Sequence, residues 1–382
     1  MKLKRNLNLT DSILFELGGI IGAGIFVIIG LAASKAGSYI PISILIAGIA
    51  SILTAFTYAE LSSAIPEEGG EYAFSKKISK KLGLIVGGGW IIADVLAAST
   101  VMLGFTAYFN LILTIPFISI IGLIMLALIS VSGVKKSALA NNAITLLKII
   151  ALVVFIIFAL TSTQTPQPAI QTGSEGILAG AGLMFFAFSG FGKITELSEE
   201  VKNPEKTIPK AVIVGVVIVI VIYLLTAISA LNIASPQQLS TTVTPLATGI
   251  SSKVVQWIII AGALLATLSV ALTLINGASR ILYSMTKNKF ILKLNNEGVP
   301  SNAIIIISTV IALLTLAVKV NTVIYLASMA LILFYALLNL ALIYLKEKKT
   351  IKTKYSFFYP YPQIIAFITL IVLFFSLTPM LG

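Results

Sequence analysis

Two charged residues lie deep inside long apolar stretches of this sequence. Asp94 comes eleven residues after Gly83, where an apolar run begins, and Lys148 comes six residues into another run. At ~1.5 Å per helical residue, these positions are about 16 Å and about 9 Å from the ends of their runs. Carboxyl and amino groups at such depth can bind and release protons, so both residues are candidates for proton coupling. The alternatives are a structural tie between helices for Asp94 and, for Lys148, an ammonium that reaches back to the near end of its helix.

Backbone groups are a second source of chemistry, because glycines interrupt two of the apolar runs. Residues 18–24 (GGIIGAG) interrupt the first run, and residues 180–192 (GAGLMFFAFSGFG) interrupt the sixth. Each glycine weakens a helix by ~1 kcal/mol relative to alanine. Opened backbone within a membrane is tolerated where it lines a cavity, and there free N–H groups can bind a carboxylate and free carbonyls an ammonium. An amino acid carries both groups. Close helix packing at the small residues Gly18 and Gly22 is the alternative explanation.

The composition defines the class of chain that carries these groups. Of 382 residues, 58% are hydrophobic and 10% are charged, whereas a soluble domain is about a quarter charged. This excludes a soluble enzyme, a secreted domain and a disordered scaffold, and it predicts an all-α polytopic membrane protein. The chain has no cysteine and no histidine, which removes thiol catalysis, disulfides and the commonest metal ligands. We therefore expect no catalytic residues, no metal and no cofactor, so the protein is not an enzyme.

Apolar runs of spanning length predict about eleven transmembrane helices, since each needs ~20 residues. They fall at 12–33, 40–64, 83–109, 113–133, 142–161, 177–195, 209–232, 254–285, 302–318, 321–345 and 360–381. The runs at 83–109 and 254–285 exceed this length, so we expect those helices to be tilted. A tight turn at 319–321 separates the ninth run from the tenth.

Lysine and arginine lie mainly in alternate loops. With the N-terminus inside the cell, 22 of the 26 fall in cytoplasmic segments, three in outer segments, and Lys148 within a span. This asymmetry predicts a multi-pass protein of the cytoplasmic membrane, in contact with lipid, with a cytoplasmic N-terminus. The net charge of +12 is thereby explained without a nucleic-acid partner. The uncharged outer loops 162–176 and 233–250 suit the capping of an outer vestibule.

The positions of the two interrupted helices predict an inverted repeat. They are first and sixth in the series, and five spans is an odd number, so a second copy of a five-helix unit enters the membrane from the opposite face. Secondary transporters commonly have this arrangement, with broken helices meeting at the midplane. We expect one transmembrane domain over 1–382, with repeats at 12–161 and 177–345 and an additional helix at 360–381.

Four motifs in these spans resemble those of the amino acid–polyamine–organocation transporter family. They are residues 19–26 (GIIGAGIF), 58–66 (YAELSSAIP) with 69–72 (GGEY), 188–191 (FSGF), and 199–204 (EEVKNP) followed by Pro209. The motifs stand in the family's order and on the corresponding spans. The resemblance implies the five-plus-five inverted-repeat (LeuT-like) fold and alternating access without ATP.

The resemblance also implies roles for individual residues. The substrate carboxylate would bind backbone N–H groups at Ala23 and Gly24, and the adjacent Gly22 would also belong to the substrate site. The substrate ammonium would bind carbonyls near Ile20, Phe186 and Ser189, beside Gly190. Phe186 would gate the pocket, although ordinary packing would also explain it, and Glu16 at the start of the first helix could join an inner gate.

Lys148 matches a fifth-helix lysine that, in proton-coupled members of the family, places its ammonium between the first and eighth helices. Thr267, Ser269 and Thr273 of the eighth run could line the same region. Cationic amino acid transporters carry an acid shortly after a Gly-Trp pair on the third helix. Here Gly89-Trp90 is followed by Asp94, with the acid offset by about one position. We therefore hypothesise that Lys148 and Asp94 titrate as a coupled pair. One departure is that Gly192, followed by Lys193, occupies the place where many members carry an acid.

These observations favour a secondary active transporter of amino acids that is coupled to protons. If Asp94 is neutralised by Lys148, it is not available to a cationic substrate, so a neutral amino acid is expected. The alternatives are an uncoupled amino acid exchanger and a polyamine or cationic amino acid carrier. A channel would need a repeated filter or a ring of charge.

Overall fold

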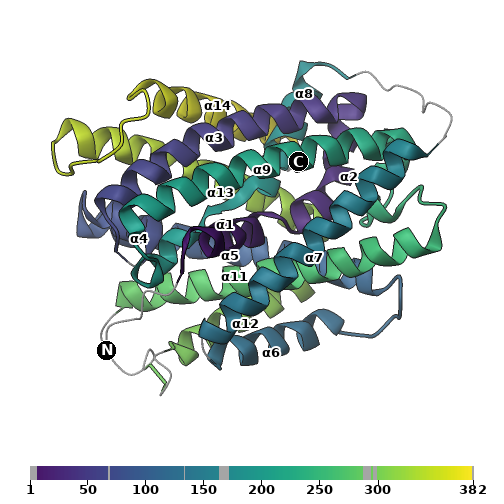
Figure 1. The fold of residues 1–382 in the computed structure, drawn as a ribbon, viewed down its shortest axis with the longest axis horizontal. Coiled ribbons are helices and arrows are strands. Elements are labelled where there is room, and N and C mark those ends of the chain that lie inside the picture. Colours follow the sequence, from purple (N-terminus) through teal and green to yellow (C-terminus); the bar gives the residue numbers. More distant parts are fainter. Residues whose placement is uncertain are drawn as a thin grey trace.

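Long apolar helices run past one another through the whole of the computed structural model (Figure 1). The structure describes residues 7–67, 69–132, 134–162, 172–286, 294–295 and 299–380. Within them, eight segments are long and apolar enough to cross a membrane, and the first of these, Leu9–Ala64, contains two of the predicted spans. Two shorter apolar helices, Ile118–Val131 and Ser301–Ala317, match two more. The described segments therefore account for all eleven predicted runs, and the all-α polytopic fold class is confirmed.

The first span is broken where the glycines predicted it. Helix α1 (Leu9–Ile20) ends before a π-helix, η1 (Gly24–Ile28), which continues into α2 (Ile29–Ala36). Asn8 begins α1 with a capping box, in which its side chain and that of Asp11 each accept a hydrogen bond from the other's backbone N–H. Because such a cap satisfies the first free N–H groups of the helix, it fixes where α1 starts.

The rest of the first half follows the predicted runs closely. Its helices are α3 (Ile40–Ala64), the short α4 (Gly70–Lys76), α5 (Lys80–Phe109), α6 (Ile118–Val131) and α7 (Val134–Thr161). Residues 58–66 and 69–72, the two parts of one motif, meet in space, because the Tyr58 hydroxyl of α3 donates to the Glu71 carboxylate of α4.

The second half begins with another broken helix. Its elements are α8 (Ser174–Phe188), β1 (Ser189–Gly192), η3 (Lys193–Glu200), α9 (Pro204–Ile233), α10 (Pro236–Ser240), η4 (Pro245–Ala247), α11 (Lys253–Thr286), α12 (Ser301–Ala317), α13 (Val320–Glu347), α14 (Tyr361–Leu377) and η5 (Thr378–Met380). Helix α8 stops at Phe188, although the apolar run predicted a helix to 195. Gly190 and Gly192 take left-handed conformations with φ of 110° and 86°, which glycine adopts without steric cost, and the chain leaves the helix there.

The outer surface of the bundle is apolar. Leu128, Ile92 and Ile157 are among the large hydrophobic side chains that are more than half exposed. A water-soluble protein rarely exposes so much contiguous apolar surface, so these faces suit contact with lipid. This distribution agrees with a multi-pass membrane protein.

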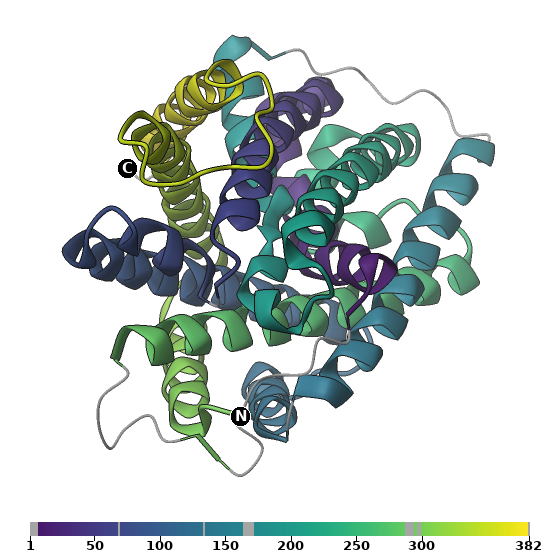
Figure 2. The same ribbon diagram turned by 60° about the vertical axis from the view of Figure 1, so that its left-hand side comes forward.

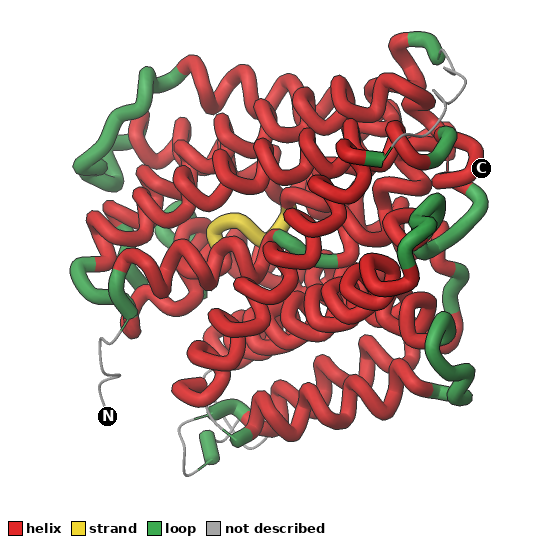
Figure 3. The backbone as a smooth tube through the Cα atoms, turned by 45° about the vertical axis from the view of Figure 1, so that its right-hand side comes forward, coloured by secondary structure: helices red, strands yellow, loops and turns green. Residues whose placement is uncertain are grey.

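The two breaks lie at the centre of the bundle, where other helices hold them. Helix α1 packs against α9, α7 and β1, while α5 packs along α11 and α3 along α9 and α8. Figure 3 shows β1 in the middle of the molecule, surrounded by helices. In the predicted outer loop 233–250, the short α10 packs on α2, and the Leu239 carbonyl lies 2.5 Å from where a Cβ on Gly30 would be.

The loop between α13 and α14 crosses the end of α3 (Figure 2). The Glu60 carboxylate accepts hydrogen bonds from the Lys346 ammonium at 2.7 Å and from the backbone N–H of Phe357 at 3.0 Å. The Phe357 ring also stacks on Phe56, with ring centroids 5.1 Å apart. Glu60 thus fastens this loop to α3.

Candidate functional site

The first break leaves carbonyl groups that other helices satisfy. Ile21 has an extended ψ of 100°, so the last carbonyls of α1 lose their partners within the helix. The Tyr223 hydroxyl lies 3.1 Å from the Ile20 carbonyl, and the Lys148 ammonium donates to the carbonyls of Gly18 and Ile21, each at 2.6 Å. Beyond the break a helix starts again at Gly24, and the first N–H groups of a helix have no acceptor within it.

The second break presents the complementary end of a helix. Helix α8 ends at Phe188, and the Ser189 hydroxyl donates to the Phe186 carbonyl at 2.6 Å. The Tyr223 hydroxyl lies 3.0 Å from the Ala187 carbonyl as well. Since a phenol has one proton, Tyr223 can donate to only one of the two broken helices at a time.

The two breaks touch through their backbones. A Cβ on Gly24 would lie 2.2 Å from the Ala187 Cα, and a Cβ on Gly190 would lie 2.5 Å from the Gly19 carbonyl oxygen. Both distances are far below van der Waals contact. Only glycine, which has no Cβ, allows the two backbones to approach this closely at Gly24 and Gly190.

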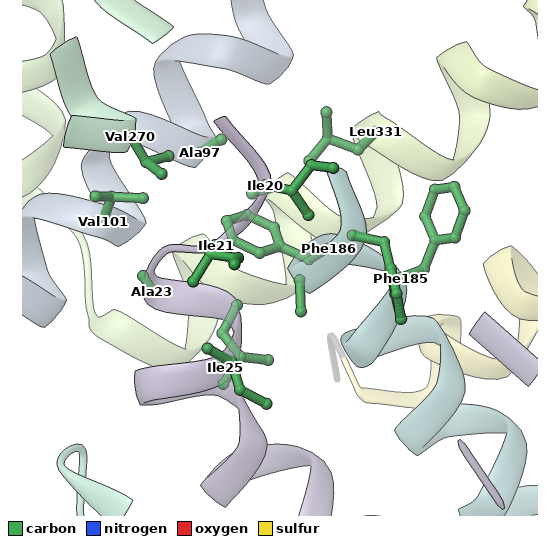
Figure 4. Close-up of a cluster of buried hydrophobic side chains, with 14 of the residues drawn as sticks. Ile20, Ile21, Ala23, Ile25, Ala97, Val101, Phe185, Phe186, Val270 and Leu331 are labelled. Atoms are coloured by element: carbon green, nitrogen blue, oxygen red, sulfur yellow. The ribbon is translucent and has the colours of Figure 1, made fainter. Parts of the chain in front are cut away.

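A small cavity lies beside the breaks. It is lined by Gly19, Ile20, Gly22, Ala23, Gly24, Ala97, Val101, Phe186, Ser189, Val270 and Leu274. Its volume is about 20 Å³. This is enough for one water, which needs about 10–15 Å³, but not for an amino acid. Figure 4 shows Phe186 beside Ile20 and Ile21, with Val101 and Val270 nearby. Of the residues predicted to bind substrate, all but Gly190 line this cavity; none of the described lining residues is charged.

Lys148 is fully buried and holds the first break to another helix. Besides the carbonyls of Gly18 and Ile21, its ammonium donates to the Ser269 hydroxyl of α11 at 2.9 Å. An ammonium has three donors, and these three acceptors use them all. The side chain lies between the first and eighth spans, rather than extending to the end of its helix. Of the other hydroxyls predicted there, Thr267 and Thr273 donate to carbonyls of their own helix.

The structure places another lysine than Lys148 against Asp94, so the hypothesis of a coupled Lys148–Asp94 pair has no direct contact behind it. The Asp94 carboxylate accepts from the ammonium of Lys193 at 2.8 and 3.1 Å, and both side chains are buried. Lys193 is one of the 22 cations that the charge pattern assigns to cytoplasmic segments. Because the chain leaves α8 at glycines and turns into η3, this lysine comes back toward α5.

Glu16 is buried in α1 and contacts the second break. Its carboxylate accepts from the backbone N–H groups of Gly192, at 3.0 and 3.2 Å, and of Ile194, at 3.3 Å. These N–H groups lie at the start of η3, where a carboxylate is favourable because of the helix dipole. Glu16 therefore links the first broken helix to the second.

Tyr223 and Lys193 are the residues that sequence reasoning missed. Tyr223 lies in an apolar run in which one tyrosine is unremarkable, and no spacing connects it with residues 20 and 187. The signal for Lys193 was its position one residue after Gly192, where the family pattern is interrupted.

Comparisons with known proteins identify the family of the chain. A family model for amino acid permeases matches residues 7–381, so the chain belongs to this family, as the motifs indicated. One relative is the branched-chain amino acid permease of Bacillus subtilis, 29% identical over 75% of this chain and 68% of the relative. The methylthioribose transporter of the same organism is 29% identical over 96% of this chain and 86% of the relative. Cationic amino acid transporter 5 of Arabidopsis thaliana is 29% identical over 60% and 44%. The protein is a multi-pass membrane transporter of the amino acid permease family, and not an enzyme.

Proposed function

We propose that this permease carries neutral, apolar amino acids across the cytoplasmic membrane by alternating access, coupled to protons, with its N-terminus in the cytoplasm. The observation that supports it most directly is the cavity at the two broken helices. Backbone groups there can bind the common part of an amino acid, and the remaining lining is apolar. The proposed five-helix repeats, 12–161 and 177–345, would each contribute one of these broken helices.

The two ends of the substrate have different partners in this proposal. The N–H groups of Ala23 and Gly24, at the start of η1, would bind the carboxylate, because a helix N-terminus favours an anion. The ammonium would bind the hydroxyl of Ser189, whose oxygen keeps its lone pairs while it donates to Phe186. The Phe186 carbonyl beside it already accepts from the Ser189 hydroxyl and backbone N–H, so it would take the ammonium by exchanging one of these donors. The carbonyl of Ile20 becomes a further acceptor when the Tyr223 proton points to Ala187.

The side chain of the substrate would contact Ala97, Val101, Val270 and Leu274. These residues favour an aliphatic side chain, because apolar surface removed from water contributes about 25 cal/mol per Å². The relative named as a branched-chain amino acid permease supports the same substrate class. The small volume of the cavity implies that a substrate enters only after Phe186 or its neighbours move, which is the gating role proposed for Phe186.

Lys148 would be the proton-coupling residue. A neutral amine has two N–H donors, so deprotonation leaves one of its three acceptors without a partner. The acceptors belong to α1 and α11, so this loss would weaken the contact between the two helices. Proton release would thus favour their separation, and proton binding would restore it.

The test is uptake by purified protein in liposomes. Radiolabelled leucine, valine, alanine, lysine, spermidine and methylthioribose would be compared with and without an inward proton gradient. We expect gradient-driven accumulation of the aliphatic amino acids. Accumulation that does not depend on the proton gradient but requires amino acid inside the liposomes would instead identify an exchanger. Uptake restricted to lysine or spermidine would contradict selectivity for neutral amino acids.

A further inference from the structure

A cation-binding subsite is built into the protein next to the cavity. Asp94 supplies a fully buried carboxylate, and the Trp90 ring lies beside it with its centroid 5.7 Å from the Lys193 ammonium. Tyr335 packs edge-on against Trp90, with ring centroids 4.9 Å apart. A carboxylate next to aromatic faces is the chemistry that recognises a primary ammonium. In this protein the ammonium of Lys193 occupies the place beside Asp94 and Trp90.

The subsite and the cavity share one face of α5. Trp90, Asp94, Ala97 and Val101 follow one another at helical spacing, and Ala97 and Val101 line the cavity. From Asp94 to Ala97 is a rise of about 4.5 Å along the helix. A lysine or ornithine held in the cavity has a side chain long enough to cover that distance.

Lys193 lies next to Gly19, one of the residues that line the cavity. Its Cβ lies 3.8 Å from where a Cβ on Gly19 would be, and Gly19 lines the cavity. Its side chain therefore runs from beside Gly19 to Asp94, along the route that the side-chain ammonium of a cationic substrate would take. Glu71 is another charged group near this path. Its carboxylate accepts from the Tyr58 hydroxyl, and the Tyr58 ring packs against Tyr335 with ring centroids 5.9 Å apart.

We propose that Lys193 acts as an internal substitute for a substrate ammonium and thereby makes the transporter selective for neutral amino acids. This rests on the proposed function, since it assigns the charge selectivity of that same site. Shortening Lys193 vacates the subsite and admits cationic amino acids such as ornithine and lysine. The rival explanation is that the Asp94–Lys193 pair only holds α5 to η3 during the transport cycle.

The experiment measures competition by ornithine against labelled leucine, and uptake of labelled ornithine, in liposomes with the full chain. Lys193→Ala removes the ammonium and leaves the space of the lysine side chain empty. Lys193→Met removes the charge but keeps most of the volume, and the double variant Asp94→Asn with Lys193→Ala lacks the carboxylate. We expect Lys193→Ala to bind ornithine roughly tenfold more tightly than the wild type, about the value of one charge-assisted hydrogen bond. Neither the Met variant nor the double variant should gain ornithine binding.

Each outcome decides the proposal. If Lys193→Ala transports leucine but gains no ornithine binding, or if the double variant gains it equally, the proposal is wrong and the pair is only a tie. A Lys193→Ala protein that is recovered only when ornithine is present during purification supports the proposal, because the added ammonium replaces the missing one. If the Lys193→Ala variant cannot be recovered either with or without ornithine during purification, the proposal is wrong, because the added ammonium does not replace the missing one. A wild type that transports no amino acid would instead contradict the proposed function.

Discussion

The ammonium of Lys148 is fully satisfied by three acceptors, two of them backbone carbonyls that belong to the break in α1. A hydrogen bond from a charged donor contributes about 1.5–3 kcal/mol. The side chain therefore stabilises an opened helix that glycines have weakened. Holding the break accounts for a buried charge at this depth, and the proposed proton coupling would give the same ammonium a second role.

Replacing Lys148 tests the coupling directly. We expect Lys148→Met to reduce gradient-driven leucine uptake roughly tenfold or more, since the carbonyls of Gly18 and Ile21 lose charge-assisted donors, and to remove the dependence of uptake on pH. Initial rates in liposomes across external pH would measure both effects. The matched control is Lys319→Met, on an exposed lysine, which should behave as the wild type. Normal, pH-dependent uptake by Lys148→Met would exclude the coupling role.

Glu16 is a second buried charge whose partners are backbone groups. Glu16→Gln keeps the shape but weakens the hydrogen bonds from Gly192 and Ile194, so we expect a loss of about 1–3 kcal/mol in stability. Thermal unfolding in detergent would report it as a lower midpoint. Glu67→Gln, which removes an exposed partner of Lys77, should cost less than about 1 kcal/mol. Equal effects from both substitutions would show that Glu16 does not hold the second break.

At the scale of elements, the contact between η1 and α8 sets the shape of the site. Gly24→Ala would place a methyl group 2.2 Å from the Ala187 Cα, and backbone moves aside less readily than a side chain. We expect a loss of about 1–3 kcal/mol or more, together with loss of leucine binding. Gly88→Ala is the control, because its Cβ would meet only the Met285 methyl at 4.0 Å and should be neutral or stabilising by about 0.5–1 kcal/mol. Normal binding and unfolding by Gly24→Ala would contradict the tight contact.

The tyrosine bridge is another link between elements. Tyr223→Phe removes the hydroxyl shared by the carbonyls of Ile20 and Ala187, so a buried acceptor loses its donor at a cost of about 1–3 kcal/mol. We expect weaker leucine binding, measurable by scintillation proximity with purified protein. Tyr344→Phe, on an exposed ring, should leave binding unchanged. Unaltered affinity in Tyr223→Phe would show that the bridge does not shape the site.

Sequence patterns predicted the helix bounds and the two helix breaks well, because both depend on local composition. Helix α5 begins three residues before the predicted 83 and ends at the predicted 109, and glycines marked both breaks. The partners of Asp94 and Lys193 were not predictable, because they depend on how η3 folds back after Gly192. Periodicity identifies which residues share a helix face, but it does not identify which residue of a distant segment reaches that face.

At the scale of the whole molecule, orientation can be tested with the natural absence of cysteine. Thr350→Cys and Thr241→Cys each create a single thiol at an exposed position. With the proposed topology, a membrane-impermeant maleimide should label Cys at 241 on intact cells and label Cys at 350 only after the membrane is opened. Labelling in the reverse order would contradict the cytoplasmic N-terminus, while leucine uptake by each variant controls for folding.

The backbone contacts of Gly24 with Ala187 and of Gly190 with Gly19 also restrict how the molecule can move. Where main chain meets main chain, no rotamer change can absorb sliding, so the two broken helices are expected to travel as one rigid piece. Helix α5 meets α11 partly through flexible side chains, such as Met285 against Gly87, and such a surface can repack. A spin-label pair across α2 and α8 should therefore keep one narrow distance distribution through the cycle, while a pair across α5 and α11 should show two.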